Sequence, residues 1–174
     1  MLLSTQTDNV FAKCGVDEGL KIFAAAGYDA LDYSMFGMTN DDNFLNKCDV
    51  EAFAKELRGK AEAVGLRFNQ AHAPFPLFRR SDAEYSEFLM ETMEKCVAIC
   101  DFLGIPAIVA HPCTYLDKDQ EREVNLNMYR RMMRFAGKYN VKICLENLIG
   151  ARPNGVFAEG RLSDAELCCR MLDT

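Results

Sequence analysis

Runs of basic residues are missing from this chain of 174 residues, which carries 20 Lys and Arg against 26 Asp and Glu. The formal net charge is −6 and the sequence pI is about 5.0. Proteins that bind the phosphate backbone of nucleic acids concentrate Lys and Arg on one face. The acidic balance therefore argues against a nucleic-acid partner, although it leaves room for a local basic patch.

Membrane and secretion signals are also lacking. No apolar run approaches the about 20 residues that a membrane span needs. The first three residues lead directly into a polar segment, so no signal peptide is expected. The eight cysteines are scattered and include no CxxC pair. We therefore expect a cytoplasmic protein without a membrane partner, whose thiols serve as small core residues rather than as a disulfide framework.

A repeated pattern is present instead: an amphipathic helix, then Gly or Asn, then a short apolar strand. The junctions are Gly27, Gly65, Gly104 and Asn140, and both residue types accept the left-handed conformation that closes a helix. Four repeats predict alternating parallel strands and helices.

The expected strands cover residues 2–6, 29–33, 66–71, 106–110 and a buried stretch at 141–149. Helices are expected at 16–26, at 50–64, from the segment 81–84 to 103, at 119–139 and from the segment 163–166 onward. Asp49 is expected to cap the second helix. The segments Ser81–Glu84 and Ser163–Glu166 both read Ser-Asp-Ala-Glu, a capping box that opens a helix. Residues 7–15 and the segment around 152–155 are expected to be loops.

These elements predict the α/β class, with a single domain over residues 1–174. A closed TIM (β/α)8 barrel typically needs about 250 residues. We therefore expect a partial barrel of five βα units, with three units outside this sequence. The alternative is a complete, open five-stranded sheet. It is less favoured because residues 7–15, after the first strand, contain one glycine and no GxGxxG phosphate loop.

Three ionisable groups end consecutive strands of this predicted sheet. His72 and His111, the chain's two histidines, end the third and fourth strands, and Glu146 lies near the end of the fifth. The carboxyl ends of parallel strands meet at one edge, so these side chains should converge within about 10 Å. Imidazole is a common metal ligand and proton carrier, and carboxylates bind Mg, Mn and Zn. Each group alone has a structural explanation, but their shared position favours a functional site.

Other candidates surround those strand ends. Tyr33 and Phe36, at the end of the second strand, are expected to wall the pocket. Asn147 and Gln70 are expected to bind substrate hydroxyl groups. The signal is weaker here, because such side chains also satisfy nearby backbone groups.

The segments 69–74 (NQAHAP), 108–112 (IVAHP) and 143–147 (ICLEN) resemble the xylose isomerase-like TIM-barrel superfamily. That superfamily includes sugar and sugar-phosphate isomerases and epimerases, and the endonuclease IV type of apurinic endonuclease. The resemblance implies that Glu146 binds a divalent metal (Mn, Mg, Zn or Co) and moves a proton. It also implies that His111 lies near the substrate, with His72 as its counterpart on the third strand. We therefore expect His111 to be a catalytic residue and His72 to bind the substrate. In the nuclease branch, both histidines match positions that bind zinc.

The sequence also departs from the family's pattern in one respect. The family completes its metal site with an Asp, a His and a Glu from strands six to eight, and the expected strands of this sequence stop at the fifth. Glu146 is then the single isomerase-type ligand, and one carboxylate cannot hold a catalytic metal tightly.

Three functions stay open on this basis. The leading hypothesis is a metal-dependent sugar or sugar-phosphate isomerase/epimerase, which moves a proton through an enediolate with Glu146 as base. The second is an endonuclease IV-like nuclease with His72, His111 and Glu146 as zinc ligands, against which the acidic pI weighs. The third is an inactive fragment whose open sheet edges pair with another copy to form a homo-oligomer.

Overall fold

A computed structural model describes residues 1–113, 118–160, 162 and 164–172. Five parallel strands form one sheet in chain order. They are β1 (Ser4–Gln6), β2 (Ala30–Ser34), β3 (Arg67–His72), β4 (Ala107–Ala110) and β5 (Lys142–Leu145). Parallel strands that neighbour one another in sequence order are typical of successive units of a TIM barrel. The predicted α/β class and partial barrel are therefore confirmed.

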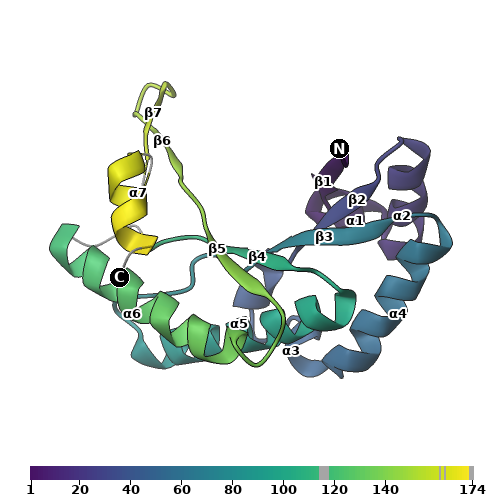
Figure 1. Ribbon diagram of the computed structural model, residues 1–174, viewed down its shortest axis with the longest axis horizontal. Coiled ribbons are helices and arrows are strands. Elements are labelled where there is room, and N and C mark those ends of the chain that lie inside the picture. The colour runs from purple at the N-terminus through teal and green to yellow at the C-terminus, as the bar shows by residue number, and fades with distance from the viewer. Residues whose placement is uncertain (114–117, 161, 163, 173–174) are drawn as a thin grey trace.

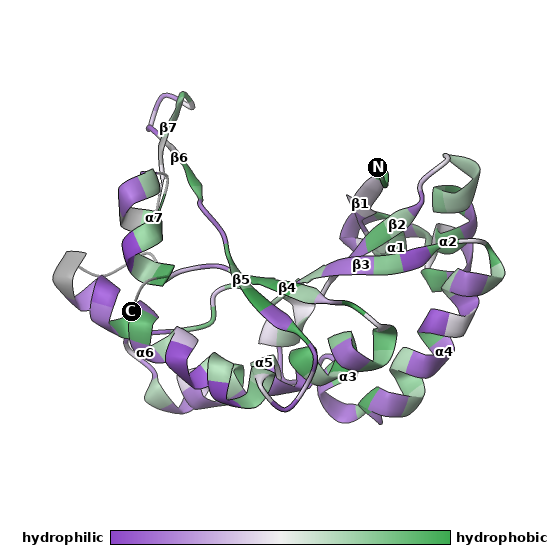
Figure 2. Ribbon diagram, viewed as in Figure 1, coloured by the Kyte–Doolittle hydropathy of each residue, from purple (hydrophilic) through white to green (hydrophobic). Residues whose placement is uncertain are grey.

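Helices alternate with these strands. They are α1 (Asp8–Cys14), α2 (Val16–Ala25), the 3-10 helix η1 (Phe36–Thr39), α3 (Phe44–Lys47), α4 (Val50–Ala63), α5 (Ala83–Leu103), α6 (Lys118–Ala136) and α7 (Ala165–Leu172). The helices α4, α5 and α6 cover one side of the curved sheet (Figure 1). Their hydrophilic and hydrophobic residues alternate along the ribbon in Figure 2, as expected for helices with one face against a sheet.

The predicted helix caps are confirmed in one case and corrected in another. The Asp49 side chain accepts hydrogen bonds from the backbone N–H groups of Glu51 and Ala52, as predicted. At α5 the cap is Asp82 rather than Ser81, because Ala83 is the first helical residue and Asp82 accepts from Tyr85. Ser163, which begins the second capping box, lies outside the described residues.

The loop predicted for residues 7–15 was wrong, because Asp8–Cys14 form the helix α1. Val10 and Phe11 of this helix pack against the core. A helix of seven residues owes its stability to such packing rather than to local propensity. Gly15, with a φ of 75°, then separates α1 from α2.

The strand predicted for 141–149 is shorter than expected and only partly buried. It ends at Leu145, and a hairpin follows in which β6 (Ile149–Ala151) pairs antiparallel with β7 (Phe157–Glu159). The predicted loop at 152–155 is the turn of that hairpin, with Gly155 at a φ of 77°. The hairpin and α7 rise together at one end of the molecule, opposite β1 (Figure 1).

The core lies between the sheet and the helices. Its fully buried side chains include Leu31 and Ile108 from the strands and Met93, Ile99 and Met132 from the helices. Three of the eight free cysteines, Cys96, Cys100 and Cys113, are buried, so the prediction that the thiols serve as small core residues holds for these three. Cys14 and Cys169 are exposed. Burial raises the pKa of Cys113 to about 12, so this thiol is unreactive at neutral pH. Within the described ranges, no helix is long and apolar enough to cross a membrane.

Two methionines provide a matched test of this core. Met93 on α5 is 0% exposed, whereas Met133 on α6 is 60% exposed. We expect Met93→Ala to lower the free energy of unfolding by about 2–5 kcal/mol, because it removes buried methylenes and leaves a cavity. Met133→Ala should change it by less than about 0.5 kcal/mol. Urea unfolding followed by circular dichroism measures both, and equal losses would contradict the described packing.

Candidate metal centre

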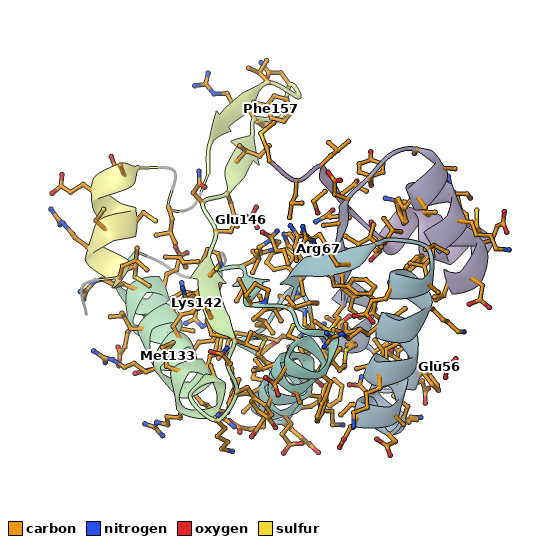
Figure 3. The ribbon with its side chains drawn as sticks, turned by 45° about the vertical axis from the view of Figure 1, so that its right-hand side comes forward. Glu56, Arg67, Met133, Lys142, Glu146 and Phe157 are labelled. Carbon is orange, nitrogen blue, oxygen red and sulfur yellow. The ribbon has the colours of Figure 1, made fainter. Side chains whose placement is uncertain are left out.

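Three predicted side chains meet at the carboxyl edge of the sheet. His72 is the last residue of β3, while His111 and Glu146 directly follow β4 and β5. Glu146 Oε2 lies 2.5 Å from His111 Nε2 and 3.6 Å from His72 Nε2. One potential ligand atom from each of the three residues lies within 4.8 Å of the others. Figure 3 shows Glu146 beyond β5, between that strand and the hairpin.

A bulge in β3 decides which side of the sheet His72 faces. Leu31 pairs with Phe68 but Asp32 pairs with Gln70, so the register shifts by one residue between β2 and β3. Strict alternation would place Phe68, Gln70 and His72 on one face. Instead, the Phe68 ring contacts Tyr33, while Gln70 and His72 both contact Asp32. The bulge thus lets one strand supply both a core aromatic and a site imidazole.

Asp32 on β2 is a site residue that the sequence analysis missed. Its two carboxylate oxygens lie 2.8 and 3.0 Å from His72 Nδ1. Gln70 donates a further hydrogen bond of 2.7 Å from its Nε2 to Asp32 Oδ2. The signal that could have found it is a carboxylate set between two apolar residues, Leu31 and Tyr33, of an expected strand. A buried carboxylate in that position requires a partner.

Two phenylalanine rings lie beside the histidines of the cluster. The Phe36 ring lies 5.7 Å from the His72 ring and 6.4 Å from the His111 ring, so Phe36 lies beside the cluster. Phe75, which the sequence analysis did not single out, lies 4.9 Å from the His111 ring. The two phenyl rings therefore form an apolar border around the imidazoles.

Tyr33 does not join this cluster, which corrects its expected place in the pocket wall. Its ring packs against Phe68 at 5.6 Å and Phe53 of α4 at 6.5 Å, on the helix side of the sheet. Burial strongly raises the pKa of its hydroxyl, as expected for a core tyrosine. Asn147 is exposed next to Glu146, and Gln70 is hydrogen-bonded to Asp32.

The electrostatics of the site favour positive charge. Burial alone lowers the pKa of His72. The hydrogen bond to Asp32 and the negative charges of Asp32 and Glu146 raise the pKa by more than burial lowers it. The pKa of His72 is therefore above its ordinary value. Two carboxylates face this imidazole, so a cation in the site would meet a favourable field.

The residues also fit a divalent metal. Glu146 Oε2 is buried and has no hydrogen-bond partner among the described residues, although His111 Nε2 is only 2.5 Å away. The two atoms are thus close but not aligned as donor and acceptor. A buried carboxylate oxygen without a partner is costly, and a cation would supply one. Two imidazoles and a carboxylate form a donor set that suits zinc and related divalent ions.

Solved structures with the same fold include three informative examples. The 3-keto-D-glucoside 4-epimerase YcjR from E. coli matches with a TM-score of 0.65 and 15% identity, over 85% of this chain and 56% of its own. The IolI protein, solved with a bound zinc atom, matches with a TM-score of 0.60 and 18% identity, over 83% of this chain and 51% of its own. An AP endonuclease of family 2 from Brucella melitensis matches with a TM-score of 0.66 and 14% identity, over 98% of this chain and 65% of its own.

At these identities the similarity shows the fold alone, and the chain spans 51% to 65% of the length of these three proteins. A comparison with curated proteins found no match. The family model of the xylose isomerase-like TIM barrel matches residues 20–173. Because that match covers most of the sequence, the chain belongs to the xylose isomerase-like TIM barrel family.

Proposed function

We propose that this chain carries metal-binding residues of a sugar or sugar-phosphate isomerase/epimerase. The observation that supports the proposal is the cluster of His72, His111 and Glu146, with ligand atoms within 4.8 Å of one another. It lies at the carboxyl ends of the strands, where TIM-barrel active sites are built. The epimerase and the zinc-bound protein among the similar structures support the same assignment.

The three residues would hold a divalent metal, of which zinc suits two imidazoles and one carboxylate best. This assignment makes His72 a ligand rather than the substrate-binding residue first expected, because its Nε2 faces Glu146. When bound, the metal would polarise a substrate carbonyl and stabilise the enediolate. Glu146 faces both histidines through Oε2. Its other oxygen, Oε1, would take and return the substrate proton.

The surrounding side chains have separate parts in this proposal. Phe36 and Phe75 border the imidazoles, where they would exclude water and contact the apolar face of a sugar. His111, whose Nε2 lies 2.5 Å from Glu146 Oε2, would share the metal with this carboxylate and so help to keep it in place during proton transfer. Asn147, exposed beside Glu146, would bind a substrate hydroxyl.

Metal affinity tests the cluster directly. We expect the protein to bind about one Zn²⁺ per chain in isothermal titration calorimetry. Glu146→Gln should weaken binding by more than about 100-fold, because it changes a ligand itself. Loss of a residue that only hydrogen-bonds to a ligand already costs about 10- to 100-fold in metal affinity. The matched control is Glu91→Gln, the same change at an exposed position of α5. Equal Zn²⁺ affinity of wild type and Glu146→Gln would overturn the assignment.

Proton transfer is tested by isotope exchange. We expect the metal-loaded protein, mixed in D2O with a panel of ketoses and ketose phosphates, to place deuterium on the carbon next to the carbonyl, as seen by NMR. Glu146→Gln should slow this exchange by about 10²- to 10⁴-fold, the usual contribution of a general base. Full activity of Glu146→Gln, with Glu91→Gln as the control, would contradict the role of Glu146.

A zinc nuclease is the second candidate. It is favoured by the presence of both imidazoles beside the carboxylate, a donor set suited to zinc. The net charge of −6 weighs against it, because a phosphodiester substrate needs positive charge. Cleavage of an abasic duplex, without deuterium exchange into any ketose, would favour this candidate over the isomerase.

We also propose that the protein forms a homo-oligomer in a reducing compartment such as the cytoplasm. All eight cysteines are free, which fits such a compartment. In the described residues, β1 and β5 are the outer strands of the five-stranded sheet. Open strand edges favour pairing with a second copy. Ile149 and Phe157 on the neighbouring hairpin are 74% and 75% exposed, which adds apolar surface near β5.

Light scattering tests this assembly. We expect a mass of at least twice the 19.6 kDa of one chain. Phe157→Ser should lower the share of the larger species, because it removes apolar surface from the hairpin. Phe44→Ser, at another exposed phenylalanine on α3, is the control. A monomer at all concentrations would contradict self-association.

A further inference from the structure

The geometry points to Asp32 as a positioning residue: we propose that it holds the His72 imidazole with its proton on Nδ1, so that Nε2 is free to bind the metal. The inference rests on the proposed metal site and deepens it. Asp32 itself lies on β2, a strand that supplies none of the three proposed ligands.

The first step is the direction of the hydrogen bond. Both oxygens of Asp32 lie within 3.0 Å of His72 Nδ1, and both side chains are less than 10% exposed. A carboxylate accepts hydrogen bonds and does not donate them, so Nδ1 carries the proton. Gln6 Nε2 lies 3.2 Å from the same ring nitrogen, but as an amide donor it cannot accept that proton. Asp32 is therefore the group that sets the tautomer.

The second step is the state of the other ring nitrogen. In a neutral imidazole only one nitrogen carries hydrogen, so Nε2 of His72 keeps its lone pair. This atom faces the site, 3.6 Å from Glu146 Oε2. The opposite tautomer would direct an N–H group at the metal position and prevent coordination by His72.

The third step is the rigidity of Asp32. Its side chain accepts a 2.7 Å hydrogen bond from Gln70 Nε2 on β3. Its backbone carbonyl accepts from the N–H of Thr7 at 3.1 Å and from the Thr7 hydroxyl at 3.2 Å. Asp32 is thus held from two neighbouring segments, its carboxylate by Gln70 and its backbone by Thr7. A carboxylate held in this way fixes the ring orientation as well as the tautomer. Carboxylate partners of this kind orient metal-binding histidines in many proteins.

The test uses the intact protein and needs no turnover. Long-range ¹⁵N–¹H NMR of the metal-free protein, at a pH where the ring is neutral, reports which nitrogen of His72 is protonated. Because the chain has two histidines, a His111→Gln sample assigns the signals. We expect the proton on Nδ1 in the wild type. A wild-type ring protonated mainly on Nε2 would overturn the inference without any substitution of Asp32.

Substitution of Asp32 gives a second readout. We expect Asp32→Asn to mix the two tautomers and to weaken Zn²⁺ binding, measured by chelator competition, by about 10- to 100-fold. The matched control is Asp29→Asn, which removes a carboxylate that accepts a 2.8 Å hydrogen bond from the Leu3 N–H, away from the site. Asp29→Asn should leave both the His72 tautomer and the Zn²⁺ affinity unchanged.

The outcomes separate this inference from the proposed function. Tight Zn²⁺ binding by the wild type together with unchanged tautomer and affinity in Asp32→Asn would refute the role of Asp32 and leave the metal site standing. Absence of Zn²⁺ binding by the wild type would refute the metal site, while the NMR experiment would still decide whether Asp32 sets the tautomer. If Asp32→Asn does not fold, Gln70→Leu removes the donor that holds Asp32 and should give a smaller shift in the same direction.

Discussion

Parallel pairing of five successive strands is the constraint on which the rest of the structure depends. Because all five run in the same direction, their carboxyl ends meet at one edge of the sheet. His72, His111 and Glu146 occupy those ends on β3, β4 and β5 and therefore converge, although they are far apart in the sequence. The helices pack their apolar faces against one face of the sheet and bury it in the core. The edge formed by the carboxyl ends of the strands is left for polar side chains.

The polar groups at that edge form a continuous chain of contacts. Gln70 donates to Asp32, Asp32 contacts His72, and His72 and His111 both face the Glu146 carboxylate. From Asp32 onward these contacts alternate acidic and basic groups. They converge on a buried oxygen of Glu146 that has no hydrogen-bond partner in the described part of the chain. Buried polar groups require partners. The arrangement therefore favours a cation at its open end.

Most of the fold followed from the sequence, and the errors have physical reasons. Four of the five strands, β2 to β5, were predicted because each follows a helix-ending Gly or Asn with a short apolar run. The helix α1 was missed because its stability comes from packing of Val10 and Phe11 on the core. The β6–β7 hairpin was missed because strands of three residues are too short to show an alternating pattern.

For the site, the sequence alone determined that His72, His111 and Glu146 share one edge, because strand order and direction follow from the helix-strand pattern. Only the tertiary structure decided their partners. The bulge in β3 turns His72 toward Asp32 while Phe68 stays with Tyr33 in the core. A prediction based on strict alternation along a strand misses such a shift. One extra residue moves every side chain that follows it to the opposite face of the sheet.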